Sequence, residues 1–548
     1  MATDIRAQEQ VIVDSKRDLF GDLRTVCLLA LCITVLNMLW FSCDYHFPTQ
    51  DEAEHIMNSI VGKDLLRHFH PWSHHWWYQV LTINCFYPPT AYMVNGFFML
   101  ILGQSRLTDQ LSLTFFLCMA ISSIYGIVRL LNGSCLAAAL SACCLVLYPL
   151  INQLSHGFFL DLPEVAMTAL SLMTLLWWRS SRVPKWKRTI LTAFVLGISC
   201  LTKQLVAAYL LPIGLYYLIT DIRIGLKYEP FKTQWILHTL CIGLITVLIG
   251  LPFMVINYQY SRDLTHSLVQ DITLKHIHVS YIDKIYAYWQ IMPQQTSILL
   301  LIIFFLALVF LSRQQHFRLW PIGLSALGGF LLTCTLPGFH QSARYLAPFL
   351  IVTAIYTGFL LAKFFLSPIR WQRLSVIGIT IAATINCIVY NFVPYPWDCP
   401  QLRRLLPLFD HRGHPSPSVD WGYSFVIETI KNVDRNSPVY LNILTNLDTL
   451  HEHAFELLLK EEGNTSIKPT SARYFTIVGD KVHFTPSTAL YSQWYLWKTG
   501  AVGYKFFDKE SQINFNQLVE FVRYSGNFKL VAQKGLPDGS QLMLYRRK

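Results

Sequence analysis

The sequence predicts a polytopic α-helical membrane protein with a small α/β domain at its C-terminal end. Of the 548 residues, 53% are hydrophobic and only 14% are charged, whereas soluble domains carry about 25% charged residues. Apolar stretches of about 20 residues, long enough to cross a bilayer, recur between Val26 and Phe392. Beyond Asp398 these stretches end and charged residues become frequent. The expected parts are a polar N-terminus at 1–24, a membrane domain at 25–397 and a C-terminal domain at 398–548.

Apolar segments in the membrane domain predict about eleven transmembrane helices. They lie at 25–43, 109–131, 134–154, 162–178, 189–203, 205–220, 234–256, 297–312, 319–336, 346–364 and 374–393. A further apolar segment at 91–103 is too short to span comfortably, and it follows Pro88 and Pro89, which break any helix arriving from upstream. We expect this segment to form an interfacial or re-entrant helix.

Basic loops set the orientation of these spans. The positive-inside rule places the loops that carry Arg179, Arg188, Arg313 and Arg370 in the cytoplasm. With an odd number of spans, the N-terminus is then cytoplasmic, and both the first long loop at 44–108 and the C-terminal domain are extracytoplasmic. The N-terminus has no cleavable signal pattern, so we expect the first apolar helix to remain as an anchor.

Carboxylates occur at the predicted outer membrane surface, where anchoring does not require them. Asp51 and Glu52 directly follow the first span, and Asp161 begins a later one. A carboxylate there can deprotonate an acceptor hydroxyl or amine, and ionisable groups at this depth are candidates for function. The alternative is that Asp51 and Asp161 cap the helices that follow them.

Two cations and an aromatic run complete the candidate groups. Lys203 interrupts a long apolar stretch, and Arg344 with Tyr345 opens the outer end of a span. Each cation is suited to bind a phosphate or to snorkel to the interface. The run 68–78 is rich in histidine and tryptophan and favours an interfacial aromatic belt. A sugar-stacking surface or a metal site is the alternative there.

Several functional classes find no support in the sequence. The net charge of +11 is concentrated in short basic loops, which is typical of membrane topology rather than of nucleic-acid binding. The 13 cysteines show no metal or disulfide spacing. We therefore predict no metal site and no cofactor, and whether the reaction requires a metal stays open.

Taken in order, the motifs resemble those of the GT-C membrane glycosyltransferases, most nearly the branch that contains protein O-mannosyltransferases and lipid A aminoarabinose transferases. The resemblance covers about residues 20–400 and rests on Asp51-Glu52, Tyr87-Pro88-Pro89, Phe159-Leu160-Asp161-Leu162-Pro163, Leu201-Thr202-Lys203 and Arg344-Tyr345-Leu346-Ala347-Pro348. It implies a GT-C fold, a polyprenyl-phosphate-linked sugar as donor, and transfer on the extracytoplasmic face with inversion at the anomeric carbon.

The resemblance also implies roles for individual residues. Asp51 would be the catalytic carboxylate, supported by Glu52 and Asp161. Donor phosphate would be bound by Lys203, Arg344 and Tyr345, and the substrate pocket would include Tyr87, Pro88, Pro89 and His340. The aminoarabinose transferases carry a lysine where this chain has Tyr87, which departs from their pattern and removes one phosphate ligand.

Beyond the membrane domain, alternating apolar residues and turn signals predict a small α/β domain. We expect strands at 437–444, 528–532 and 541–545, a hairpin around Gly479, and helices at 447–462 and 513–524. Pro537-Asp538-Gly539 is a strong turn signal between the last two strands. This domain is expected to cap the active site or to contact the acceptor.

Two other functional classes compete with a transferase. A transporter or flippase of a lipid-linked or anionic solute commonly shows paired repeats and broken helices at the bilayer midplane. This sequence shows no such repeat, and its acids gather at one face. A scaffold with an outer interaction domain is the third reading. The sugar and the acceptor (protein, lipid or glycan) stay open, and we expect a bacterial inner membrane with the site facing the periplasm.

Overall fold

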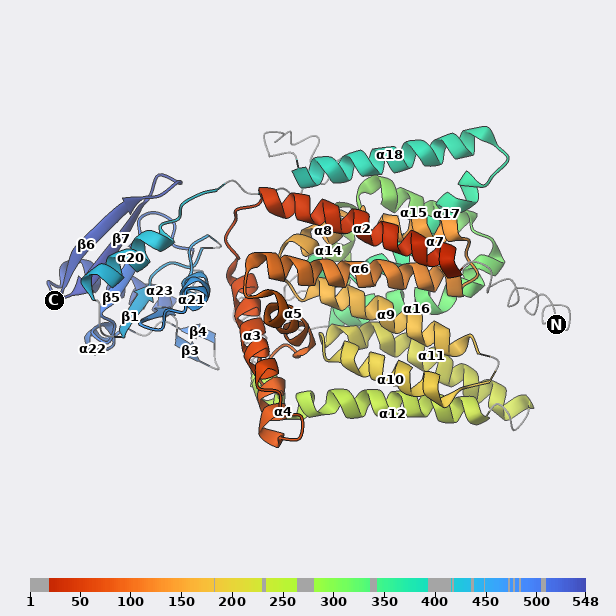
Figure 1. The fold of residues 1–548 in the computed structure, drawn as a ribbon, viewed down its shortest axis with the longest axis horizontal. Coiled ribbons are helices and arrows are strands. Elements are labelled where there is room, and N and C mark those ends of the chain that lie inside the picture. The colour runs from red at the N-terminus through yellow and green to blue at the C-terminus, as the bar shows by residue number, and fades with distance from the viewer. Residues whose placement is uncertain are drawn as a thin grey trace.

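The computed structural model describes residues 19–181, 183–228, 233–263, 280–335, 343–392, 415, 418–434, 438–447, 449–471, 474–476, 479–481, 484–503 and 509–548. Figure 1 shows a bundle of lengthwise helices with a smaller α/β domain at one end. This arrangement confirms the predicted fold class. The predicted boundary at Asp398 and the pocket residue His340 lie outside the described residues.

A helix lies at each predicted span. These helices are α2 (Leu19–Cys43), α6 (Arg106–Leu130), α7 (Cys135–Val146), α8 (Pro149–His156), α9 (Asp161–Arg179), α10 (Trp186–Cys200), α11 (Leu205–Tyr228), α12 (Thr233–Ile256), α15 (Ile298–Phe310), α16 (Arg313–Thr335), α17 (Phe349–Phe365) and α18 (Arg370–Phe392). The segment predicted as one span at 134–154 is bent by 64° between α7 and α8. Pro149 causes the break because it begins α8 and cannot continue α7.

The number of full-length spans is smaller than the number of apolar segments. Among the described residues, six helices are long and apolar enough to cross a membrane alone. The number rises to eight if the bent pairs α7–α8 and α14 (Tyr281–Thr296)–α15 each form one span. Helices α10 and α17, with 15 and 17 residues, are shorter than the usual span of about 20.

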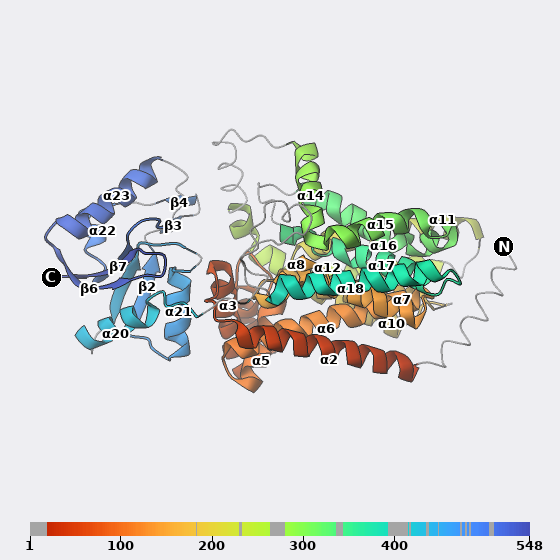
Figure 2. The same cartoon turned by 90° about the horizontal axis from the view of Figure 1, so that it is seen from above.

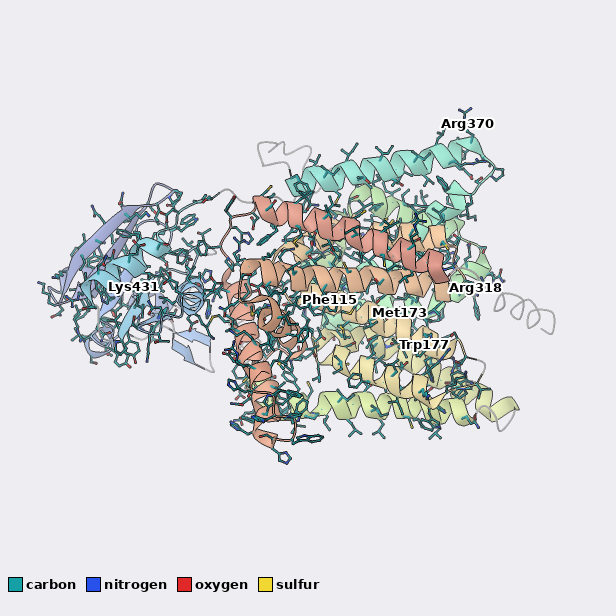
Figure 3. The ribbon with its side chains drawn as sticks, in the orientation of Figure 1. Phe115, Met173, Trp177, Arg318, Arg370 and Lys431 are labelled. Atoms are coloured by element: carbon teal, nitrogen blue, oxygen red, sulfur yellow. The ribbon has the colours of Figure 1, made fainter. Side chains whose placement is uncertain are left out.

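Three further helices lie at the end of the bundle that faces the α/β domain: α3 (Gln50–Arg67), α4 (His74–Leu81) and α5 (Thr90–Leu102). Helix α3 runs across the ends of the lengthwise helices (Figure 1). Helix α5 is the short apolar helix predicted at 91–103, and it packs against α3. Arg318 and Arg370 lie at the opposite end of the bundle (Figure 3). The basic loops therefore lie at the opposite end of the bundle from α3 and its acidic motif.

Two glycines let α5 and α3 approach closely, and this contact places α3. A Cβ atom on Gly96 would lie 2.5 Å from the backbone N of Lys63 and 2.8 Å from the backbone C of Gly62. We expect Gly96→Ala to lower stability by about 1–3 kcal/mol, because the two backbones must separate. Thermal unfolding in detergent measures this. Gly214→Ala in α11 is the matched control, since its Cβ would meet nothing within 4 Å; an equal loss there would contradict the argument.

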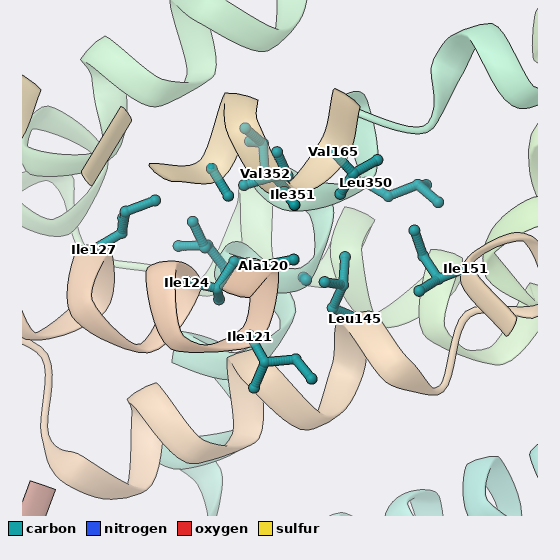
Figure 4. Close-up of a cluster of buried hydrophobic side chains, with 14 of the residues drawn as sticks. Ala120, Ile121, Ile124, Ile127, Leu145, Ile151, Val165, Leu350, Ile351 and Val352 are labelled. Carbon is teal, nitrogen blue, oxygen red and sulfur yellow. The ribbon is translucent and has the colours of Figure 1, made fainter. Parts of the chain in front are cut away.

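The hydrophobic core of the bundle fixes the lengthwise helices relative to one another. Figure 4 shows buried side chains from α6, α7, α8, α9 and α17 meeting in one cluster. Val165 of α9 and Leu350 of α17 are completely buried there. The start of α9 and the start of α17 are therefore fixed relative to each other. Asp161 begins α9, and Arg344 and Tyr345 lie in the turn just before α17.

The C-terminal domain is a mixed sheet between two pairs of helices (Figure 2). Its main sheet has the order β2-β1-β5-β7-β6, with β1 parallel to β2 and β5, and β7 antiparallel to β5 and β6. The elements are α20 (Tyr423–Val433), β1 (Val439–Ile443), α21 (Glu452–Glu461), β2 (Ile467–Ser471), β3 (Tyr474–Thr476), β4 (Gly479–Lys481), α22 (Pro486–Ala489), β5 (Trp494–Lys498), α23 (Lys509–Tyr524), β6 (Phe528–Gly535) and β7 (Gln541–Arg547).

Most of the predicted elements of this domain are confirmed. The sequence prediction missed β2, β5, α20 and the short helix α22. Strand β5 is buried on both faces, so it lacks the alternation that marks a strand. Strand β2 contains Pro469, which argues against a strand in general but is tolerated here because β2 lies at the sheet edge.

Candidate active site

Asp51 lies in the first turn of α3, at the end of the bundle near the α/β domain. The start of this helix is held by a capping box, in which the Glu52 carboxylate accepts hydrogen bonds from the Thr49 backbone N and hydroxyl, both at 2.7 Å. Asp51 takes no part in that box. Its side chain is 53% exposed, and Oδ2 accepts a hydrogen bond from Nη2 of Arg344 at 3.1 Å. Glu52 is buried, and its carboxylate also lies 3.9 Å from Nε2 of His46.

Lys203 lies in the turn between α10 and α11 and is held by two acids of α9. Its Nζ donates to Oδ1 of Asp161 at 2.6 Å and to Oε2 of Glu164 at 2.7 Å. All three side chains are buried, so Lys203 does not snorkel to the interface. Glu164 is a site residue that the sequence prediction missed. Its spacing of three from Asp161 is the signal, because residues i and i+3 share a helix face.

Tyr345 connects the two cations. It belongs to a single turn at Ala343–Leu346 that precedes α17. Nζ of Lys203 lies 5.1 Å from the centre of the Tyr345 ring, and the guanidinium of Arg344 lies 5.9 Å from the same ring. The Arg344 guanidinium also lies 5.3 Å from the ring of Phe159. The aromatic faces stabilise both cations in a partly desolvated place.

Tyr87, which precedes Pro88 and Pro89, lies close enough to Lys203 and Arg344 to interact with them electrostatically. Asn84 Oδ1 accepts from the backbone N of Phe86 and Tyr87, which fixes the turn ahead of the two prolines. Thr90 N donates to Leu201 O at 3.0 Å, so this segment is tied to the turn that carries Lys203. Burial raises the pKa of Tyr87, and its phenol therefore stays protonated and can donate a hydrogen bond.

His55 lies at the centre of these groups, one turn after Asp51, and the sequence prediction missed it. Its Nδ1 is 3.0 Å from the Tyr92 hydroxyl, and its ring meets Tyr87 edge-on at 5.5 Å. Burial lowers the pKa of His55 to about 4, against the opposing effect of the nearby carboxylates of Asp51 and Asp161. His55 is therefore neutral at physiological pH and adds no charge to the site.

The predicted site residues converge, although they come from distant parts of the chain. Asp51, Asp161, Lys203 and Arg344 all act electrostatically on His55. Glu52 supports the helix start instead. In the part of the chain that the structure describes, no group of three or more His, Cys, Asp or Glu residues is arranged to hold a metal ion. In the run 68–78, Trp72 and Trp77 are exposed, whereas Trp76 is buried.

A second charged network lies behind the capping box. Asp44 Oδ2 is 2.5 Å from Nδ1 of His46 and 3.0 Å from Nη2 of Arg106. Nε2 of His46 is 3.9 Å from the Glu52 carboxylate. Burial opposes the charge on His46, but the hydrogen bonds to Asp44 and Glu52 prevail and raise its pKa to about 9. This network connects the start of α3 to α6.

The raised pKa of His46 predicts a pH-dependent contribution to stability. The protonated form stabilises the fold, so the full contribution is present below about pH 6.5 and is lost as the pH rises through about 9. We expect the unfolding temperature of wild type to exceed that of His46→Gln at pH 6 and to approach it at pH 10. Asp44→Asn removes the carboxylate that pairs with His46, so this variant should lose the same pH dependence of the unfolding temperature. A constant difference across this range would show that His46 does not carry the charge.

An apolar groove of about 720 Å³ lies between α9, α10, α11 and α12, and two of its lining residues, Leu201 and Gln204, belong to the turn that carries Lys203. Its lining is mostly leucine, alanine and glycine, with Gln204 at the end nearest Lys203. The Gln204 side chain donates to the backbone O of Phe86, in the segment that carries Tyr87. A charged site near one end of an apolar groove suits an amphipathic ligand with an anionic head and a hydrocarbon tail.

The model of the dolichyl-phosphate-mannose-protein mannosyltransferase family matches residues 87–248, which include Tyr87, Asp161 and Lys203. Among solved structures, ArnT from Cupriavidus metallidurans bound to undecaprenyl phosphate is 12% identical, with a TM-score of 0.57, and the alignment covers 96% of this chain and 98% of that one. This chain has the GT-C fold. ArnT from the same organism in the apo state is 13% identical, with a TM-score of 0.57 and coverage of 94% and 97%. Comparison with curated protein sequences finds no match.

The GT-C fold accounts for the placement of the site. Asp51 and Arg344 lie outside the segment that the family model matches, and the fold brings them to the residues inside it. Helix α3 crosses the end of the bundle that faces the α/β domain (Figure 1). Asp51 at its start is bonded to Arg344, and the Tyr345 ring joins Arg344 to Lys203.

Proposed function

We propose that this chain is a membrane glycosyltransferase that moves a sugar from a polyprenyl-phosphate donor to an acceptor on the extracytoplasmic face. The observation that carries the proposal is the pairing of Asp51 with Arg344 beside the Lys203–Tyr345 contact. One carboxylate and two cations, with an apolar groove that begins at the turn carrying Lys203, suit an inverting transfer from a lipid phosphate. The lipid-bound state of ArnT gives independent support.

In this mechanism Asp51 accepts the proton of the acceptor hydroxyl or amine as the acceptor attacks the anomeric carbon. The bond between that carbon and the phosphate oxygen breaks, and polyprenyl phosphate leaves as an anion. Attack opposite the leaving group inverts the anomeric carbon. A phosphate leaving group needs little acid assistance, so one base and fixed cations suffice. Preorganised charge in a water-poor site is commonly the largest catalytic contribution.

Donor binding is assigned to the two cations and the aromatic ring between them. Arg344 presents paired donors to the phosphate, and Lys203 adds a point charge that Asp161 and Glu164 hold in place. Tyr345 and the Tyr87 hydroxyl are assigned to the same phosphate pocket. Pro88 and Pro89 restrict the backbone that follows Tyr87. They are assigned to the substrate pocket together with His340. The prenyl tail fits the apolar groove.

The test is the release of polyprenyl phosphate from a panel of undecaprenyl-phosphate-linked pentoses and hexoses by the purified protein in detergent, with donor binding measured in parallel. Release of the phosphate supports the transferase and identifies the sugar. Movement of the intact lipid-linked sugar across a proteoliposome membrane, with no bond broken, would instead establish a flippase. If the protein neither releases the phosphate from any donor nor binds any donor, the proposal is overturned.

A further inference from the structure

The loop that joins α2 to α3 passes between the membrane bundle and the C-terminal domain. This loop, residues 44–49, is called here the junction loop, and it ends two residues before Asp51. Helix α21 of the C-terminal domain packs against α3 directly after the loop. Leu457 of α21 belongs to the hydrophobic core of the bundle. The two domains therefore share a packed interface at the place where α3 begins.

The middle of the junction loop is inserted into the C-terminal domain. Phe47 packs against that domain's core, and its ring stacks on Tyr423 with centroids 4.6 Å apart. Tyr423 in turn meets Phe455 of α21 at 4.5 Å. An aromatic side chain from the membrane domain thus fills part of the hydrophobic core of the other domain, which holds the loop by apolar burial.

A buried histidine adds a directional contact. His451 is completely buried and is the N-cap of α21, where its Nδ1 accepts from the backbone N of Ala454 at 3.3 Å. Nδ1 therefore carries no proton, and the proton of the neutral ring is on Nε2. Nε2 lies 3.1 Å from the backbone O of Pro48, to which it donates. One side chain thus caps a helix of the C-terminal domain and holds the junction loop.

The two ends of the junction loop are held by the membrane domain. Asp44 is bound to Arg106 of α6. At the other end, Thr49 is the N-cap of α3 and is held by Glu52. Farther along α3, the charge of His453 on α21 acts on the half-buried carboxyl of Glu54, where it opposes the rise in pKa that partial burial causes. The loop is fixed at both ends by the bundle and in its middle by the C-terminal domain.

We infer that the C-terminal domain positions Asp51 through Phe47 and His451. The inference rests on the proposed role of Asp51 and goes beyond it by giving the C-terminal domain a part in the reaction. Phe47 and His451 are positioning residues, since neither lies in the donor site. Loss of their contacts leaves both domains folded but loosens the first turn of α3, and a displacement of about 1 Å at a reacting group costs about 100-fold in rate.

The deciding variant is His451→Asn. Asparagine is among the best N-cap residues, so it keeps the cap of α21, but it is too short to reach Pro48 O. Phe47→Ala removes the apolar contact, and Phe47→Leu is its conservative counterpart. Tyr524→Ala is the control, because Tyr524 is 70% exposed on the C-terminal domain. Each variant is made in the full chain, and turnover of the undecaprenyl-phosphate sugar is measured together with hydrogen exchange of the peptide spanning 48–57.

We expect His451→Asn and Phe47→Ala to lower kcat by about tenfold or more, with the KM for donor unchanged and faster exchange confined to 48–57. Phe47→Leu should recover most of the kcat, and Tyr524→Ala should match wild type. Unchanged exchange in 48–57 would overturn the inference. So would faster exchange with unchanged kcat, provided that Asp51→Asn is inactive. If Asp51→Asn remains active, the proposed role of Asp51 fails first, and the inference falls with it.

Discussion

Replacing Asp51 by asparagine is expected to lower turnover by about 10²- to 10⁴-fold, the usual contribution of a positioned general base. Asparagine keeps the shape of the side chain and can still meet Arg344, but it cannot take a proton from the acceptor. Donor affinity should change little, because the phosphate ligands lie on other elements. The measurement is the release of polyprenyl phosphate under saturating donor, compared with donor binding by the same preparation.

The control for Asp51→Asn is Asp64→Asn. Asp64 is on the same helix and is 52% exposed, against 53% for Asp51, so the two substitutions remove equally solvated charges. Both variants should unfold within about 0.5 kcal/mol of wild type, since exposed ion pairs contribute little. Equal turnover in wild type and Asp51→Asn removes Asp51 from the reaction. Equal losses in both variants would indicate an effect of α3 rather than of the carboxylate.

Replacing Lys203 by methionine is expected to have the largest effect on stability, a loss of about 3–5 kcal/mol. The substitution leaves Asp161 and Glu164 buried without their cation, and an uncompensated buried charge is costly. Thermal unfolding in detergent measures the loss. Lys203→Met should also bind undecaprenyl phosphate more weakly, but this single variant does not separate instability from the loss of a phosphate ligand.

A triple variant separates the two effects. Lys203→Met with Asp161→Asn and Glu164→Gln contains no unpaired charge, so most of the stability should return. Its affinity for undecaprenyl phosphate should stay reduced, because the cation is still absent. Wild-type affinity in the triple variant would show that Lys203 serves the fold and not the donor. Wild-type stability in Lys203→Met would contradict the claim that Lys203 compensates the buried charges of Asp161 and Glu164.

Local patterns predicted much of the fold because hydrophobic periodicity and turn chemistry are properties of short segments. The helices at the predicted spans, the short helix after Pro88-Pro89 and the hairpin at Gly479 follow from such patterns. The exceptions have local reasons. Pro149 bends a segment that reads as one span, and β5 is buried on both faces and so lacks alternation.

The candidate site was predicted as a set of residue types and not as an arrangement. The motifs named Asp51, Asp161, Lys203 and Arg344, since charges at the ends of apolar helices are conspicuous. They did not indicate Glu164 as a partner of Lys203 or His55 at the centre, because both residues look like ordinary members of a helix. They also did not show that Glu52 belongs to a capping box whereas its neighbour Asp51 meets Arg344.

By itself the sequence determined the class of this protein: its composition, span lengths and basic loops indicate a helical membrane protein with its acidic motifs at one face. These properties depend on the preference of each segment for lipid or water. The tertiary structure alone decided which charges meet. Asp51 and Arg344 are separated by 293 residues along the chain, and Pro48 of the junction loop and His451 are separated by 403 residues. Such contacts depend on how helices and domains pack, and no local pattern specifies that packing.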